Sequence, residues 1–212
     1  ANIKDMVSLY EQGLADGFTT NPSLMKKAGI TNYNEFAHEV VKAIPDLSVS
    51  FEVFADDFET MKKEALKIAE FGDNVMVKIP IMNSKGESSI PLIKELSELG
   101  VNLNITAILT VKQVEDVVEV LQEDTNNIVS VFAGRIADTG VDPVPIMLES
   151  AKICHSKKGV QLLWASSREL YNVIQADQVG ADIITCTPAI ISKIPMIGKD
   201  LLQLSQETVQ MF

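Results

Sequence analysis

The stretch Val75-Met76-Val77-Lys78-Ile79-Pro80 places one cation inside an otherwise apolar, strand-like run. Burial disfavours the charged form of a lysine, and a neutral amine is a nucleophile toward carbonyl groups. Taken alone, Lys78 fits equally well a lysine at a strand end whose ammonium group reaches water. The residues around it decide between these interpretations.

Polar residues recur at a fixed interval on both sides of Lys78. Glu52, Lys78, Asn104 and Ser130 each lie in or at the end of a short apolar run, and each follows the one before it by 26 residues. One strand plus one helix takes about that much chain, so a βα repeat would bring the four side chains to the same end of one sheet.

Helical and extended patterns alternate along the whole chain, without a long linker, so we expect one domain covering residues 1–212. The strand-like runs are apolar on both faces, as in a parallel sheet covered by helices. The predicted strands are 15–19, 47–53, 74–79, 101–108, 128–132, 160–164 and 182–185. The predicted helices are 3–13, 31–44, 57–71, 88–99, 111–122, 144–156, 167–179, 188–193 and 198–211, with a turn from Pro22 and a loop at 134–142.

Two α/β folds fit this pattern. An open doubly wound sheet places ligands at its switch point, whereas a barrel uses every strand end. Polar residues recur at the ends of six of the seven strands, which favours a (β/α)8 TIM barrel. A closed eight-stranded barrel needs one more strand ahead of Ala1, so we expect the first strand to be missing from the chain as given.

The bulk properties exclude several classes of function. The 212 residues are 46% hydrophobic, enough for a full core, and the net charge of −11 disfavours nucleic acid or an anionic membrane as a partner. No signal peptide and no apolar run of about 20 residues is present, so we expect a soluble, cytoplasmic protein. Cys154 and Cys186 fit free thiols in a reducing compartment.

Cofactor and metal motifs are absent from the sequence. No Gly-x-Gly-x-x-Gly or Walker A pattern follows a predicted strand, and His38 and His155 lie far apart in predicted helices. We therefore expect no cofactor and no metal. Glu52 is the one carboxylate set in an apolar strand, where it serves either as an acid/base group or as a counter-charge to a cation such as Lys78.

Five motifs occur in order and carry a family resemblance. They are Asp16-Gly17-Phe18-Thr19-Thr20-Asn21-Pro22-Ser23-Leu24, Val77-Lys78-Ile79-Pro80, Asn104-Ile105-Thr106, Val131-Phe132-Ala133-Gly134-Arg135 and Ala165-Ser166-Ser167-Arg168. Together they resemble the transaldolase family, specifically its short single-domain branch, over essentially the whole chain. The resemblance implies a (β/α)8 barrel and class I aldol chemistry without a metal.

The resemblance also implies roles for particular residues. Lys78 corresponds to the Schiff-base lysine, Glu52 and Thr106 hold and activate the catalytic water, and Asn21 and Asn104 bind hydroxyls of a dihydroxyacetone unit. The positions that hold the sugar phosphate correspond to Arg135 and Arg168 with Ser130 and Ser166. Two arginines at strand ends suit bidentate phosphate recognition, although each alone is more often a surface charge.

The implied reaction moves a dihydroxyacetone unit from a ketose phosphate, fructose 6-phosphate or sedoheptulose 7-phosphate, to an aldose phosphate in the pentose phosphate pathway. In the family the base for the C4 hydroxyl is an aspartate that ends the first strand, just ahead of the position of Ala1. We expect sugar phosphates as the substrates, and a homo-oligomer.

Two alternatives stay open at this stage. A fructose-6-phosphate aldolase would release dihydroxyacetone, but members of that branch tend to carry Gln at the position of Glu52 and Tyr at that of Phe132, so both substrate-site positions resemble transaldolase. The other alternative is a non-catalytic barrel that binds sugar phosphates.

Overall fold

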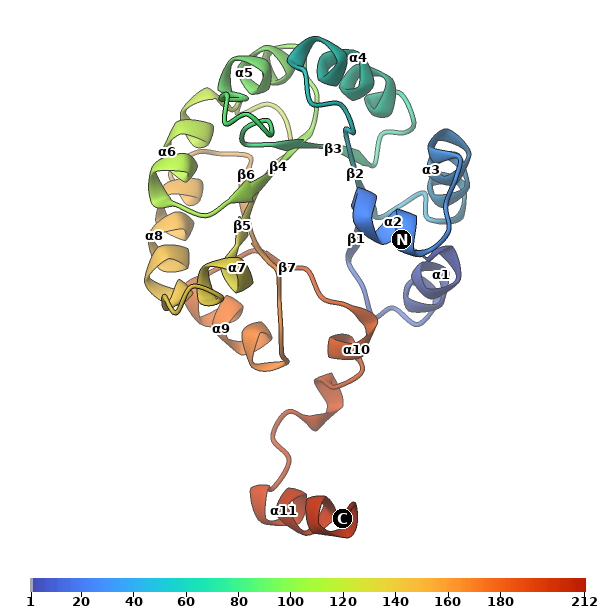
Figure 1. Cartoon of the computed structure of the whole chain (residues 1–212), viewed down its shortest axis with the longest axis vertical. Helices are drawn as coiled ribbons and strands as arrows, with labels where there is room; N and C mark the ends of the chain where they lie inside the picture. The colour runs from blue at the N-terminus through green and yellow to red at the C-terminus, as the bar shows by residue number, and fades with distance from the viewer. Residues whose placement is uncertain (1) are drawn as a thin grey trace.

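Seven parallel strands form one sheet in the order of the sequence, each paired with the next. The computed structural model describes residues 2–212. The sheet curls into a barrel-like shape with the helices outside it (Figure 1). The strands are β1 (Gly17–Thr19), β2 (Ser48–Glu52), β3 (Val75–Pro80), β4 (Leu103–Ile108), β5 (Asn127–Phe132), β6 (Val160–Ala165) and β7 (Ile183–Ile184). The predicted TIM-barrel-like α/β architecture is confirmed.

The helices that follow the strands cover the outer face of the sheet (Figure 1). The helices are α1 (Ile3–Glu11), α2 (Pro22–Lys27), α3 (Tyr33–Ala43), α4 (Phe58–Ala69), α5 (Ile90–Glu98), α6 (Val111–Val120), α7 (Ala133–Ala137), α8 (Pro143–His155), α9 (Tyr171–Val179), α10 (Pro188–Ile191), the 3₁₀ turn η1 (Ile194–Met196) and α11 (Leu201–Gln210).

Strand side chains alternate between two environments, as the period of two requires. On β3, Val77 and Ile79 belong to the large core packed beneath the helices, whereas Met76 belongs to a small second cluster with Ile128 and Leu163. Lys78 lies on the same face of its strand as Met76. Both faces of β3 are therefore buried, and its one cation, Lys78, points into the barrel.

Two short helices replace segments that we predicted to be irregular. The predicted loop 134–142 contains most of α7, and α2 begins at the predicted turn at Pro22. Proline is well tolerated in the first turn of a helix, and Asn21 caps α2 by accepting a hydrogen bond from the backbone N–H of Leu24 at 2.7 Å. The turn prediction was wrong because Pro22 starts a helix.

One side-chain contact links β1 to the residue that follows β7. The Thr19 and Thr185 hydroxyl oxygens lie 3.1 Å apart, within hydrogen-bonding distance. Within residues 2–212, β1 pairs only with β2 and β7 only with β6, so this side-chain contact is not extended by backbone pairing. No helix among the described residues is long and apolar enough to cross a membrane.

Candidate active site

Lys78 lies near the carboxyl end of β3 with only 9% of its surface exposed. Its amine donates a hydrogen bond to the backbone oxygen of Thr20 at 2.8 Å. Burial lowers the pKa of the lysine from its ordinary value, and the nearby charge of Glu52 opposes that shift. Burial thus shifts the amine toward its neutral form, the form in which lysine attacks carbonyl carbons, and the Thr20 carbonyl orients it.

Glu52 and Thr106 form the second part of the site. Glu52 pairs with Lys78 across β2 and β3, so the two side chains are neighbours on one face of the sheet. The Thr106 hydroxyl donates to Glu52 Oε1 at 3.0 Å. A carboxylate and a hydroxyl held together beside the amine can bind a water molecule and exchange protons with it.

A bulge in β4 accompanies the position of Thr106. Ile105 pairs with Val129 and Ile108 with Val131, so three steps on β4 match two on β5. Ala107 absorbs the extra residue with φ 60°, a left-handed conformation that is uncommon for alanine. Bulges of this kind change the direction of side chains next to active sites. No sequence pattern predicted this bulge.

The segment after β2 is held from two helices. The Tyr33 hydroxyl on α3 donates to the backbone oxygen of Glu52 at 3.0 Å, and Glu64 on α4 accepts from the backbone N–H of Ala55 at 2.7 Å. Burial, followed by the charges of Glu52 and Glu64, raises the pKa of Tyr33, which keeps its hydroxyl a donor. Neither residue is recognisable as part of the site from the sequence, because both lie on helices.

Asn104 and Ser130 are joined in a buried chain of hydrogen bonds. Ser130 Oγ donates to Asn104 Oδ1 at 2.6 Å, and Asn104 Nδ2 donates to Ser50 Oγ at 3.2 Å. Asn104 is in register with Lys78 on the neighbouring strand. Ser50 was not among our candidates, although its position two residues before Glu52 places it on the same face of β2.

The candidate phosphate residues follow the next two strands, β5 and β6. Arg135 lies on α7 and is exposed, whereas Arg168 lies beyond β6 and donates from Nη2 to Asp138 Oδ2 at 2.8 Å. Ser166 directly follows β6 and has φ 59°, again a left-handed conformation on a residue other than glycine. Phe132 ends β5 half-buried against the cluster inside the barrel.

The start of α7 and the segment after β6, which carry these residues, touch at Gly134. A Cβ atom at Gly134 would lie 1.8 Å from the backbone oxygen of Ser166 and 3.0 Å from its Cβ. Only glycine allows this approach, so Gly134 fixes the distance between the segment of Arg135 and the segment of Arg168.

The predicted residues at the ends of β1 to β4 lie close together. Asn21 directly follows Thr20, the residue whose carbonyl receives Lys78, but Asn21 Oδ1 already accepts the cap bond of α2. Glu52 is among the residues that line a cavity of about 390 Å³ at the ends of β2 and β3, with Phe54 and Met82 at its exposed wall, whereas Lys78 and Thr106 do not line it.

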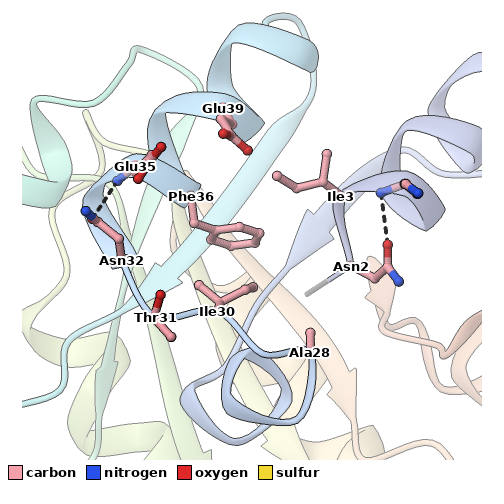
Figure 2. Close-up of a pocket in the computed structure, with 10 residues that line it drawn as sticks. Asn2, Ile3, Ala28, Ile30, Thr31, Asn32, Glu35, Phe36 and Glu39 are labelled. Carbon is pink, nitrogen blue, oxygen red and sulfur yellow. Dashed lines mark hydrogen bonds between the residues drawn. The ribbon is translucent and has the colours of Figure 1, made fainter.

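A second cavity lies elsewhere and contains none of the predicted site residues. Figure 2 shows this cavity of about 450 Å³ between the start of α1 and α3, with Ile3 and Phe36 facing each other across it. Glu35 and Glu39 form part of its rim. Its position outside the barrel separates it from the candidate active site.

A curled parallel α/β sheet with a buried lysine and a neighbouring carboxylate at its strand ends defines a protein of the TIM-barrel-like class. The chain belongs to the transaldolase/fructose-6-phosphate aldolase family, whose model matches residues 1–212, and it is an enzyme of that family.

Individual relatives agree with this assignment. The chain is 31% identical to a probable transaldolase of Nitrosopumilus maritimus, covering 92% of this chain and 84% of that protein. It is 35% identical to a probable transaldolase of Methanococcus maripaludis, covering 92% and 86%. A solved structure of a monomeric dihydrodipicolinate synthase variant matches with a TM-score of 0.63 at 9% identity, covering 97% of this chain and 71% of that one, which shows the shared fold alone.

Proposed function

We propose that this chain is a transaldolase that transfers a dihydroxyacetone unit from a ketose phosphate to an aldose phosphate through a Schiff base on Lys78. The observation that carries the proposal is the buried amine of Lys78, with its lowered pKa and its hydrogen bond to the Thr20 carbonyl. Fructose 6-phosphate and sedoheptulose 7-phosphate are the proposed donors.

The amine of Lys78 attacks C2 of the ketose phosphate, and loss of water from the adduct gives a protonated imine. When a base takes the C4 hydroxyl proton, C4 becomes an aldehyde carbon and C3–C4 breaks. The fragment from C4 onward leaves as a shorter aldose phosphate, and the electron pair of the broken bond moves into the imine, which becomes an enamine. The enamine then attacks an aldose phosphate, and water hydrolyses the new imine. The water that is lost when the first imine forms is matched by the water that hydrolyses the last one, and no step requires a cofactor.

Glu52 and Thr106 serve the proton transfers at the imine. Their hydrogen bond directs the carboxylate toward the face of the sheet that carries Lys78, where it can hold the water that is lost and regained. The carboxylate also stabilises the cationic imine, because opposite charges at short range favour each other. Asn104 and Asn21 are the proposed partners of the substrate hydroxyls, and their free amide N–H groups are the available donors.

The phosphate is proposed to bind between the loops after β5 and β6. Gly134 keeps Arg135 and Arg168 on adjoining segments, and Ser166 adds a hydroxyl donor. Ser130 can donate to the phosphate only by giving up its hydrogen bond to Asn104 Oδ1. Guanidinium groups bind phosphate oxygens bidentately, which supports local anion binding in a chain whose net charge is −11.

Glu52 and Phe132 favour transfer over release. We expect that, with fructose 6-phosphate and an aldose phosphate acceptor both present, the enzyme forms a new ketose phosphate faster than it liberates free dihydroxyacetone. Product quantification by coupled assay or mass spectrometry measures both rates in one reaction. Predominant release of dihydroxyacetone would assign the chain to the aldolase branch of its family.

We further propose that the chain acts in the cytoplasm, in the pentose phosphate pathway, as a homo-oligomer. The last proposal is supported by α11, which projects away from the barrel (Figure 1) and has no buried residue. Leu202 and Val209 lie on one face of this helix and are 81% and 63% exposed, and Phe212 just beyond it is 97% exposed. An apolar face of this kind gains stability only when another surface covers it.

The assembly proposal has a direct test. We expect the protein to sediment as a multiple of its 23.2 kDa chain and the double variant Leu202→Glu/Val209→Glu to sediment as the monomer, because the two charges would be buried in the interface. Gln203→Glu/Gln210→Glu is the matched control, with the same spacing on a polar strip about 100° around the helix. A monomeric unmodified protein at micromolar concentration would contradict the proposal.

A further inference from the structure

An ion pair joins the ends of two neighbouring strands beside the proposed phosphate site. Arg168, beyond β6, donates from Nη2 to Oδ2 of Asp138, the residue that ends α7 after β5, at 2.8 Å. The two side chains are 53% and 56% exposed. The pair therefore lies at the molecular surface, where a ligand can reach the guanidinium.

The backbone around this pair is held without the help of Asp138. Asn172 Oδ1 accepts from the backbone N–H groups of Arg168 and Glu169 at 2.8 and 3.1 Å. The contact of Gly134 with the backbone of Ser166 sets the spacing of the two loops. Asp138 thus acts on the side chain of Arg168 and not on the loop that carries it.

The two arginines of the proposed phosphate site differ in whether a carboxylate pairs with them. Within residues 2–212, Arg168 has a carboxylate partner and Arg135 has none. A carboxylate and a phosphate use the same guanidinium N–H donors. An exposed ion pair contributes little free energy, so a phosphate with three acceptor oxygens and about two charges can replace the carboxylate, whereas a neutral hydroxyl cannot.

We propose that Asp138 is a specificity-determining residue that occupies Arg168 in the free enzyme and is displaced by the phosphate of the substrate. It lowers the affinity for every ligand that uses Arg168 and thereby excludes those that cannot compete with a carboxylate. The inference rests on the proposed phosphate site and deepens it, since it assigns a resting partner to one of the two arginines.

The test is equilibrium binding of inorganic phosphate, fructose 6-phosphate and fructose, measured by isothermal titration calorimetry on the full chain. Asp138→Asn should bind both phosphate-containing ligands about two- to fivefold more tightly, the gain that opening an exposed ion pair of up to about 1 kcal/mol allows. Binding of fructose should not change. The gain should vanish in the double variant Asp138→Asn/Arg168→Ala.

Glu149→Gln is the matched control, because it removes one negative charge from an exposed site on α8 that pairs with Lys152 and not with Arg168. An equal gain in this variant would show that net charge alone is responsible and would overturn the inference. Unchanged or weaker phosphate binding by Asp138→Asn would overturn it as well, the weaker binding showing that Asp138 positions Arg168 for the ligand.

A separate measurement on Arg168→Ala tests the proposed phosphate site itself. Arg168→Ala should weaken phosphate binding in the otherwise unmodified protein. If Arg168→Ala has no effect, or if the unmodified protein binds no phosphate, the phosphate site itself is wrong and the role of Asp138 is refuted with it. If Arg168→Ala weakens binding and Asp138→Asn does not strengthen it, only the role of Asp138 is refuted.

Discussion

Replacing Lys78 with methionine abolishes turnover, by on the order of 10⁴-fold or more, because the substitution removes the nucleophile that the whole reaction scheme requires. It also abolishes trapping: borohydride reduces the imine of the unmodified protein at C2 of the sugar to a stable secondary amine, and the variant has no amine to form it. Mass spectrometry of the intact chain and of the peptide around residue 78 measures the adduct.

The fold should survive this substitution. Methionine is close to lysine in length and is apolar, so it leaves no cavity in the barrel and carries no charge to desolvate. Lys85→Met is the control, since Lys85 is an exposed lysine in the loop after β3. A reduced adduct that persists in the Lys78 variant would reassign the nucleophile, and trapping that fails in the unmodified protein would favour the non-catalytic sugar-phosphate-binding barrel.

The pH dependence of stability follows from the lowered pKa of Lys78. Because the folded state lowers this pKa below the unfolded value of about 10.5, protonation favours the unfolded chain. The resulting penalty is complete below the folded-state pKa and disappears as the pH rises through it toward the unfolded value. The gain in stability of Lys78→Met over the unmodified protein should therefore be greatest below the folded-state pKa, on the acidic side, and should shrink as the pH rises toward about 10.5.

Gly134→Ala should lower the free energy of unfolding by about 3 kcal/mol, at the upper end of the cost of overpacking. The added Cβ would lie 1.8 Å from the Ser166 backbone oxygen, so one of the two loops has to move. For a chain of this size the change corresponds to a fall in Tm of roughly 6–12 °C. Scanning calorimetry measures the effect on stability.

The same variant should lose selectivity for phosphate esters, because the loop movement separates Arg135 from Arg168. Its affinity for fructose 6-phosphate should approach that for fructose. Ala137→Ser is the control, an exposed position on the same short helix where an added atom meets open solvent. Stability and selectivity equal to the unmodified protein would show that the Gly134 contact yields without cost.

Several features followed from the sequence because they depend on local pattern. The alternation of apolar runs and amphipathic segments predicted seven parallel strands, and residues 2–212 form seven. The spacing of Glu52, Lys78 and Asn104 predicted their common place at one end of the sheet, and the register pairs Lys78 with both neighbours. A strand and a helix of regular length return the chain to the same edge, so equal spacing in sequence becomes adjacency in space.

The strand register of Ser130 does not follow from the 26-residue spacing. Asn104 pairs with Ile128 and not with Ser130, since β5 is displaced by two residues along its neighbour. Ser130 nevertheless reaches Asn104 through its side chain. Spacing along the chain counts residues but does not include the stagger between strands, which only the hydrogen-bond pairing of the folded sheet determines.

The sequence by itself determined the fold class, the seven strands and the isolated cation, because hydrophobic period and strand length are properties of consecutive residues. Only the tertiary structure decided that Thr20 receives Lys78, that Tyr33 holds the backbone of Glu52, that Ser50 completes the chain through Asn104, and that Asp138 occupies Arg168. Each of these contacts joins segments that are 19 to 58 residues apart. The packing of strands and helices around the barrel determines which residues meet in these contacts, and a local sequence pattern contains no information about that packing.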